Sequence, residues 1–205
     1  MSTKVLRLLA AIVLAASAAC TSGPSPATDD AGYLKQIADA RAEKDRFMRE
    51  DADSPVPRER RTLLLPLRYY PPNPGFSVPA VLRLADQRPV VEMPTSTGTL
   101  RRMQRVGVLE FSLLGQSLSL AAFAPDGEQV SSLFVPFTDT TTGKQTYPAG
   151  RYLDLHPTAT GIYTIDFNLA YNPSCAYDEK FECPYPPASN RLKVAVEAGE
   201  KIPGA

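Results

Sequence analysis

The chain of 205 residues has no tryptophan, one histidine and three cysteines. Its 22 basic and 22 acidic residues cancel, so it lacks the bulk positive charge that is typical of nucleic-acid-binding proteins. It also lacks GxSxG, HExxH, P-loop, GxGxxG and paired CxxC patterns, which removes the common signatures of hydrolases, zinc proteases and nucleotide-binding enzymes. We therefore predict no nucleic-acid partner, no cofactor and no metal.

The N-terminus has the layout of a secretory signal peptide. Lys4 and Arg7 precede an apolar run over residues 8–16, and small residues lead to Cys20. The run is shorter than the roughly 20 residues of a membrane-spanning helix. Small residues before a cysteine resemble the lipobox of bacterial lipoproteins, although Ser17 stands where leucine is usual. We predict a signal peptide over residues 1–19 and acylation of Cys20 (palmitate or a similar chain). This would anchor the protein to a bacterial envelope membrane, on its periplasmic or extracellular face. Plain secretion and an uncleaved anchor stay as alternatives.

The composition changes after the leader. Residues 20–31 are small, polar and proline-containing, which predicts a flexible tether. Residues 32–205 are expected to form a single domain. One helix is predicted over Tyr33–Glu50, capped by Asp29 or Asp30, because apolar residues recur with helical spacing over its first turns. We expect this helix to pack on the edge of a β core, with a role in binding a partner as the alternative.

The remaining chain alternates apolar and polar residues with the period of β-strands. Gly107 is a candidate bulge inside the longest of these runs. Short strands separated by turns predict a mainly β fold: an antiparallel β-sandwich or barrel-like domain with an N-terminal α-helix and a proline-rich, cysteine-containing C-terminal loop. The predicted strands are residues 78–84, 88–93, 100–114, 118–122, 130–137, 150–153, 161–166 and 192–196.

The stretch from Asp166 to Asn190 is the most unusual part of the sequence, because its prolines exclude a helix and it holds two cysteines. Paired cysteines in an exported protein favour a disulfide, so we predict a Cys175–Cys183 bond. Three alternatives stay open: a metal site, a Cys175 nucleophile assisted by His156 and Asp166, and reduced cysteines that only pack. His156 itself is expected at the surface.

Polar residues in and near this stretch are candidates for one binding or bracing cluster. An arginine between two carboxylates can lock strand ends through paired hydrogen bonds, or the same groups can form a ligand site with two aspartates as acid and base. Glu197 and Glu200 are expected at the solvated end of the last strand. The candidate residues are Asp139, Arg151, Asp166, Asn168, Asn172 and Asn190.

Short motifs in the second half of the chain carry a resemblance. They are Pro136-Phe137-x-Asp139, Thr142-Gly143-x-x-Thr146-Tyr147, Gly150-Arg151-Tyr152-Leu153, Asp166-Phe167-Asn168-x-Ala170-Tyr171-Asn172-Pro173, Cys175-Ala176-Tyr177, Cys183-Pro184-x-Pro186-Pro187, Asn190-x-Leu192 and Ala198-Gly199-Glu200-Lys201. Over residues 35–201 the chain resembles the prokaryotic family called domain of unknown function 1684. The resemblance implies a family placement and no activity.

Two functions from different classes follow. The first is a non-catalytic envelope module that binds a small ligand or a partner near residues 166–190. The alternative is a hydrolase-type enzyme that uses Asp139, Arg151 and Asp166. An open pocket lined by these side chains would favour the enzyme, whereas side chains occupied by internal hydrogen bonds would favour a structural role.

Overall fold

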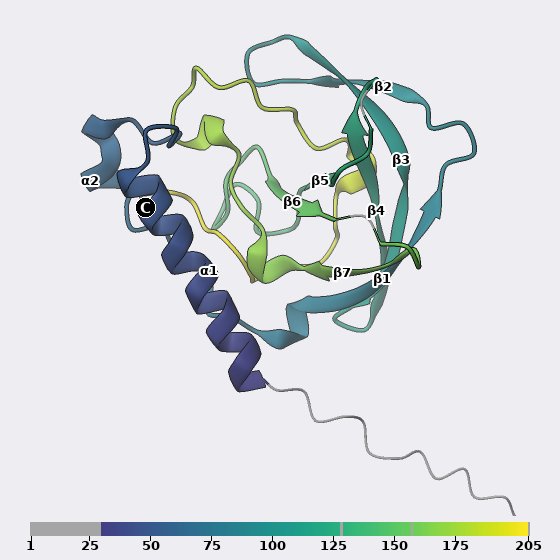
Figure 1. Cartoon of the computed structure of the whole chain (residues 1–205), viewed down its shortest axis with the longest axis horizontal. Coiled ribbons are helices and arrows are strands. Elements are labelled where there is room, and N and C mark those ends of the chain that lie inside the picture. Colours follow the sequence, from purple (N-terminus) through teal and green to yellow (C-terminus); the bar gives the residue numbers. More distant parts are fainter. Residues whose placement is uncertain (1–29, 128, 157, 205) are drawn as a thin grey trace, which may run out of the picture.

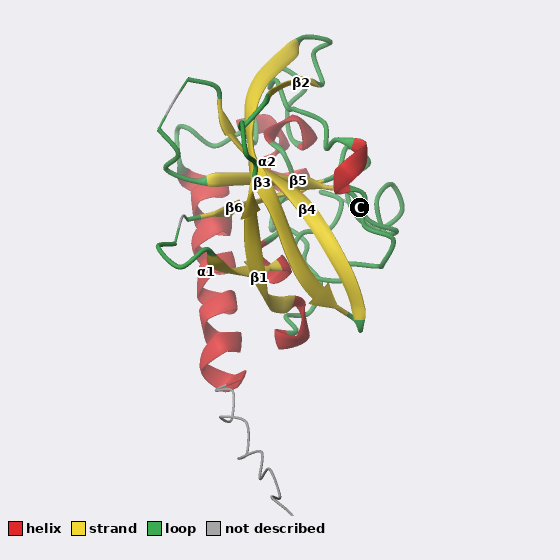
Figure 2. Cartoon of the chain, turned by 90° about the vertical axis from the view of Figure 1, so that its right-hand side faces the viewer, coloured by secondary structure: helices red, strands yellow, loops and turns green. Residues whose placement is uncertain are grey.

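The computed structural model describes residues 30–127, 129–156 and 158–204. Its centre is a seven-stranded antiparallel sheet that curls into a half-barrel, with one long helix beside it (Figure 1, Figure 2). The predicted mainly β, barrel-like fold with an N-terminal helix is confirmed. The predicted signal peptide, Cys20 and the predicted tether up to residue 29 lie outside the described residues. No helix in the described part is long and apolar enough to cross a bilayer.

The strands follow the order β6-β5-β4-β3-β1-β7, and β2 pairs with β3 outside this path. Their bounds are β1 (Ser77–Leu84), β2 (Val90–Pro94), β3 (Leu100–Leu113), β4 (Gln116–Pro125), β5 (Leu133–Phe137), β6 (Arg151–Leu155) and β7 (Ile162–Asp166). The helices are α1 (Asp30–Glu50), α2 (Arg61–Leu64) and five short 3-10 helices: η1 (Arg58–Arg60), η2 (Pro74–Phe76), η3 (Phe167–Leu169), η4 (Ser174–Ala176) and η5 (Ala188–Asn190).

Helix α1 begins at Asp30, so the last two residues of the predicted tether are helical. Its buried apolar side chains are Ile37 and Met48. Polar contacts attach the rest of the helix to the domain. Arg41, which interrupts the apolar stripe, donates to the Tyr70 carbonyl at 2.9 Å, and the Asp45 carboxylate accepts from the Leu67 amide at 2.9 Å. The weak apolar pattern after the second turn therefore reflects docking through charged side chains.

The long hairpin of β3 and β4 occupies the middle of the strand order. The register shifts between Arg105 and Gly107, which confirms the predicted bulge. A Cβ atom at Gly107 would lie 2.3 Å from the carbonyl oxygen of Arg83 on the neighbouring strand β1. Only glycine allows β1 to approach the bulge this closely.

The predicted last strand, residues 192–196, is not a strand in the structure. Leu192, Val194 and Val196 are buried in the main apolar core, which explains their alternation. Among the described residues, the backbone bonds of this segment are isolated ones, from the Leu192 amide to the Thr138 carbonyl at 2.8 Å and from the Thr140 amide to the Val194 carbonyl at 3.2 Å. A period-two pattern of burial is present here without a hydrogen-bonded ladder.

Candidate functional site

Arg151 opens strand β6 and lies inside the protein, with only 1% of its surface exposed. Its Nη2 atom donates to the Asp139 carboxylate at 2.8 Å and to the Val196 carbonyl at 2.8 Å. Its Nη1 atom donates to the carbonyls of Ala198 and Glu200. Burial lowers the pKa of the guanidinium, and the Asp139 carboxylate opposes that shift. The second Asp139 oxygen accepts from the amide and hydroxyl of Thr141, at 2.6 and 2.5 Å.

Asp166 and Asn168 belong to a different group, at the end of β7. Both Asp166 oxygens accept from the Tyr33 hydroxyl of α1 at 2.9 Å, and one also accepts from the Asn168 amide. The Asn168 side chain accepts from the Asn73 amide and donates to the Asn73 carbonyl, at 2.9 and 2.8 Å. These contacts tie α1 and the proline-rich segment before β1 to the end of β7.

Asn190 lies between strands β4 and β5, which are paired through a single residue pair. Its side chain accepts from the Ala121 amide at 2.8 Å and donates to the carbonyls of Ala121 and Pro136, at 2.8 and 2.7 Å. The side-chain amide thus replaces missing ladder bonds where a proline has no N–H to offer.

Glu200 was expected in solvent, and this prediction is wrong: only 1% of its surface is exposed. Lys44 of α1 forms an ion pair with one carboxylate oxygen at 2.5 Å. The other oxygen accepts from the Asn172 amide at 2.7 Å and from the Tyr177 hydroxyl at 3.0 Å. The Asn172 side chain donates to the Lys201 carbonyl at 2.8 Å. This buried carboxylate thus has its charged partner, Lys44, 156 positions earlier in the sequence.

Cys175 and Cys183 are buried neighbours, but the structure holds them as unbonded thiols, so the expected disulfide is absent from it. The Cys175 amide donates to the Cys183 sulfur at 3.0 Å. Hydrogen bonding between the two thiols lowers the pKa of Cys175 to about 7 and raises the pKa of Cys183.

The described residues do not assemble two of the three alternatives for this pair, the metal site and the nucleophile; the third, reduced cysteines that only pack, agrees with the buried, unbonded thiols. His156 is exposed, as expected, and the interactions of Cys175 are with Cys183, Ser96 and Tyr147 rather than with His156 and Asp166. Among the described residues no group of three or more histidine, cysteine or acidic side chains is arranged to hold a metal.

A cavity of about 630 Å³ opens beside the same loop. It lies between the proline-rich loop, the start of β3, the end of β4 and strands β5 and β6, and seven of its fifteen lining residues come from residues 171–184. None of the six candidate cluster residues lines it. The lining residues are Arg101, Arg102, Met103, Pro125, Asp126, Ser132, Phe134, Tyr152, Tyr171, Pro173, Ser174, Phe181, Glu182, Cys183 and Pro184.

The inner wall of this cavity is aromatic. The Tyr152 ring packs edge-on against Phe134, at 4.7 Å between ring centres, and against Tyr171 at 5.8 Å. The Tyr152 hydroxyl donates to the Pro184 carbonyl at 2.6 Å, and the Tyr171 hydroxyl donates to Asp154 at 2.5 Å. Burial raises the pKa of both phenols, so they stay protonated at neutral pH. Since both hydroxyls donate to protein acceptors, the wall offers a ligand mainly ring carbon.

Two ion pairs form the rim of the cavity. Arg101 contacts the Glu182 carboxylate through Nε at 3.1 Å and Nη2 at 2.9 Å, and Nη2 also donates to the Glu182 carbonyl. Arg102 contacts Asp126 through Nε at 2.9 Å and Nη2 at 2.8 Å. Sequence reasoning did not single out these four residues. The sequence feature that could have pointed to them is the pair of consecutive arginines, Arg101 and Arg102, inside a predicted strand.

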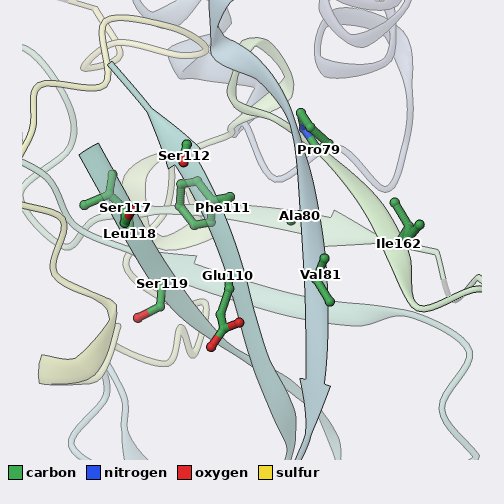
Figure 3. Close-up of a pocket in the computed structure, with 10 residues that line it drawn as sticks. All are labelled: Pro79, Ala80, Val81, Glu110, Phe111, Ser112, Ser117, Leu118, Ser119 and Ile162. Atoms are coloured by element: carbon green, nitrogen blue, oxygen red, sulfur yellow. The ribbon is translucent and has the colours of Figure 1, made fainter. Parts of the chain in front are cut away.

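A wider hollow of about 900 Å³ lies on the sheet over β1, β3, β4 and β7 (Figure 3). Its polar groups are three serines and Glu110, which pairs with Arg83 at 2.9 Å. The exposed apolar side chains beside them are Val81 and Ile162. This hollow is an open face of the sheet, without the convergent aromatic and charged groups of the cavity beside residues 171–184.

The family described as "Protein of unknown function (DUF1684)" matches residues 65–201 of the chain. The chain belongs to this family. Among solved structures, it is similar to the solution NMR structure of an uncharacterized protein of Haloarcula marismortui, with 42% sequence identity and a TM-score of 0.67. That match covers 84% of this chain and 96% of the archaeal chain. A search of curated proteins finds no match. The family and its archaeal relative therefore give a fold and no activity.

Proposed function

We propose that this DUF1684 domain is a non-catalytic module that binds a small ligand in the cavity beside residues 171–184. The observation that carries this proposal is the cavity itself, whose volume of about 630 Å³ lies in the range of small-molecule sites. Such sites combine an apolar lining with a few convergent polar groups. Here the aromatic wall and the two rim ion pairs supply that combination, and the proline-rich loop holds them in place.

The alternative, a hydrolase that uses Asp139, Arg151 and Asp166, has no supporting contact. Asp139 and Arg151 are buried and bond to each other and to neighbouring groups. Asp166 bonds to Tyr33 and Asn168 instead. An acid and a base must reach the proton that they transfer, and these side chains are occupied by internal hydrogen bonds.

Ligand binding is tested with a matched pair of tryptophan substitutions. Ser174→Trp places a large side chain in the cavity, and Ser119→Trp places the same side chain on the open sheet face. A small-molecule library is screened by NMR for shifts in residues 171–184, and each hit is titrated against both variants. We expect hits that Ser174→Trp abolishes and Ser119→Trp keeps. A library that never perturbs this loop would contradict the proposal.

We further propose that the domain acts outside the cytoplasm, attached to an envelope membrane by acylation of Cys20. The support is the leader: Lys4, Arg7, the apolar run and the small residues before Cys20. Several acyl chains hold a protein to a bilayer where one is marginal. Cys20→Ser should release the protein from washed membranes. A variant that still sediments with them after a high-salt wash would contradict the lipid anchor.

The predicted Cys175–Cys183 disulfide belongs to the same proposal. The two thiols are close enough for a hydrogen bond, and an oxidising compartment would convert such neighbours to a disulfide. Protein recovered from the envelope and alkylated without prior reduction should carry no label at either cysteine. Label at both positions would show that the thiols stay reduced after export.

A further inference from the structure

The charged groups at the rim indicate which chemical class of ligand the cavity suits. This inference rests on the proposed function. In Arg101 and in Arg102, Nε and Nη2 are held by a carboxylate, and Nη1 has no hydrogen-bond partner among the described residues. Each guanidinium is therefore fixed in direction while one of its nitrogens, Nη1, keeps its N–H donors unused. The side chains are 42% and 61% exposed, so a ligand can reach them.

Arg101 is the better placed of the two. Its partner Glu182 belongs to the loop that forms the cavity wall and is itself fixed by the Thr99 hydroxyl at 2.6 Å. The Arg101 guanidinium binds a single Glu182 oxygen through Nε and Nη2, at 3.1 and 2.9 Å, and its planar fork also suits planar acids. A second carboxylate can bind through Nη1, or it can take the place of Glu182.

The balance of charge limits how many negative groups the ligand carries. The two arginines face two carboxylates, Glu182 and Asp126, so the rim has no net charge. Such a rim does not concentrate a multiply charged anion such as a polyphosphate. It suits one acidic group on an otherwise uncharged body.

We infer that the cavity binds a planar aromatic compound carrying a single carboxylate. Its ring lies against the wall formed by Phe134, Tyr152 and Tyr171, where edge and face contacts between rings are favourable. Its carboxylate accepts from Arg101 at the rim. The volume of about 630 Å³ accommodates one or two fused rings.

Two probes with the same ring system test this inference: 2-naphthoate and 2-naphthylmethanol. Their dissociation constants are measured by NMR titration with the wild type and with Arg101→Gln. The acid should bind about tenfold more tightly than the alcohol, the size of one charge-assisted hydrogen bond at a partly exposed site. Arg101→Gln should remove this difference and leave the alcohol unchanged. Arg83→Gln, which breaks a similar exposed pair with Glu110 away from the cavity, is the control and should change neither value.

Glu182→Gln should change the affinity for the acid in the opposite direction. Removing the competing carboxylate should strengthen binding of the acid about threefold without strengthening binding of the alcohol. Equal affinity of the two probes for the wild type, or an equal loss of both in Arg101→Gln, would overturn the inference. If neither probe binds but another class of compound perturbs residues 171–184, the inference fails and the proposed function stands. If no compound perturbs that loop, both fail.

Discussion

The molecule uses the same ion pair, arginine with a carboxylate, in two opposite settings. Arg151 and Asp139 are buried, with side-chain exposures of 1% and 0%, whereas Arg101 and Glu182 are 42% and 38% exposed. Arg151 donates to four acceptors of the protein, three of them backbone carbonyls of the C-terminal segment. Arg101 uses two of its nitrogens on Glu182 and keeps one for other partners. Burial turns one pair into a brace, and exposure leaves the other available to a ligand.

The largest expected effect comes from breaking the buried pair. Arg151→Met leaves the Asp139 carboxylate and three carbonyls without their partner in the interior. Removing one member of a buried pair costs about 3–5 kcal/mol of unfolding free energy. For a chain of this size that is a fall in melting temperature of roughly 6–20 °C. An unchanged melting temperature, measured by circular dichroism, would contradict the role of Arg151 as a brace.

The next largest loss of stability should come from removing the buried, neutral side chain of Asn190. Asn190→Ala leaves the Ala121 amide and the carbonyls of Ala121 and Pro136 without partners. We expect a loss of about 2–4 kcal/mol in urea denaturation, because unsatisfied buried backbone groups each cost about 1–3 kcal/mol. Ser189→Ala, at the exposed neighbouring position, removes only the 3.3 Å hydrogen bond from the Ser189 hydroxyl to the Asn190 side chain and should change stability much less. Equal stability of the two variants would show that the gap between β4 and β5 does not depend on Asn190.

Much of the fold was predictable because burial leaves a period in the sequence. Strand β1, the long strand β3 and the bulge at Gly107 follow the predicted pattern. The pattern gave a wrong prediction of a strand over residues 192–196. Alternate side chains are buried there, but the carbonyl of Val196 bonds to the Arg151 guanidinium. Alternation reports which side chains are buried and cannot report what the backbone bonds to.

The candidate site was less predictable, because it depends on contacts between distant positions. Glu200 carries no sign in the local sequence that Lys44 will bury it. The candidate polar residues lie near one another in the sequence, yet Asp139 and Asp166 bond to different partners. The cavity instead joins the loop to Arg101 at the start of β3, 81 positions before Glu182. Such pairings follow from sheet topology, which alternation alone does not specify.

Cys175 and Cys183 belong to the loop beside the cavity, and their shifted pKa values should make the free energy of unfolding depend on pH. Between about pH 7 and 8.5, folded Cys175 has lost a proton that the unfolded chain keeps, so stability of the reduced protein should rise with pH. Above about pH 8.5 the unfolded chain loses the Cys183 proton that the folded protein retains, so stability should fall.

This maximum is measured by urea denaturation of the reduced wild type across that range of pH. Cys175→Ser is the comparison: it should lose the rising limb, and it should also weaken the falling limb, because the raised pKa of Cys183 depends chiefly on its hydrogen bond with Cys175. Parallel curves for the wild type and the variant would mean that the two thiols do not interact in the folded protein.

The smallest expected change in melting temperature comes from the exposed pair, when its arginine is replaced by methionine as in Arg151→Met. Arg101→Met removes the same charge as Arg151→Met, but the Glu182 carboxylate that it leaves behind is solvated. Exposed ion pairs contribute about 0.2–1 kcal/mol, so the melting temperature should fall by at most roughly 4 °C. The expected signature is therefore a stable protein that has lost its preference for an acidic ligand over a neutral one. A fall as large as that of Arg151→Met would mean that Arg101 also braces the loop, and the rim of the cavity would then have no donor to spare.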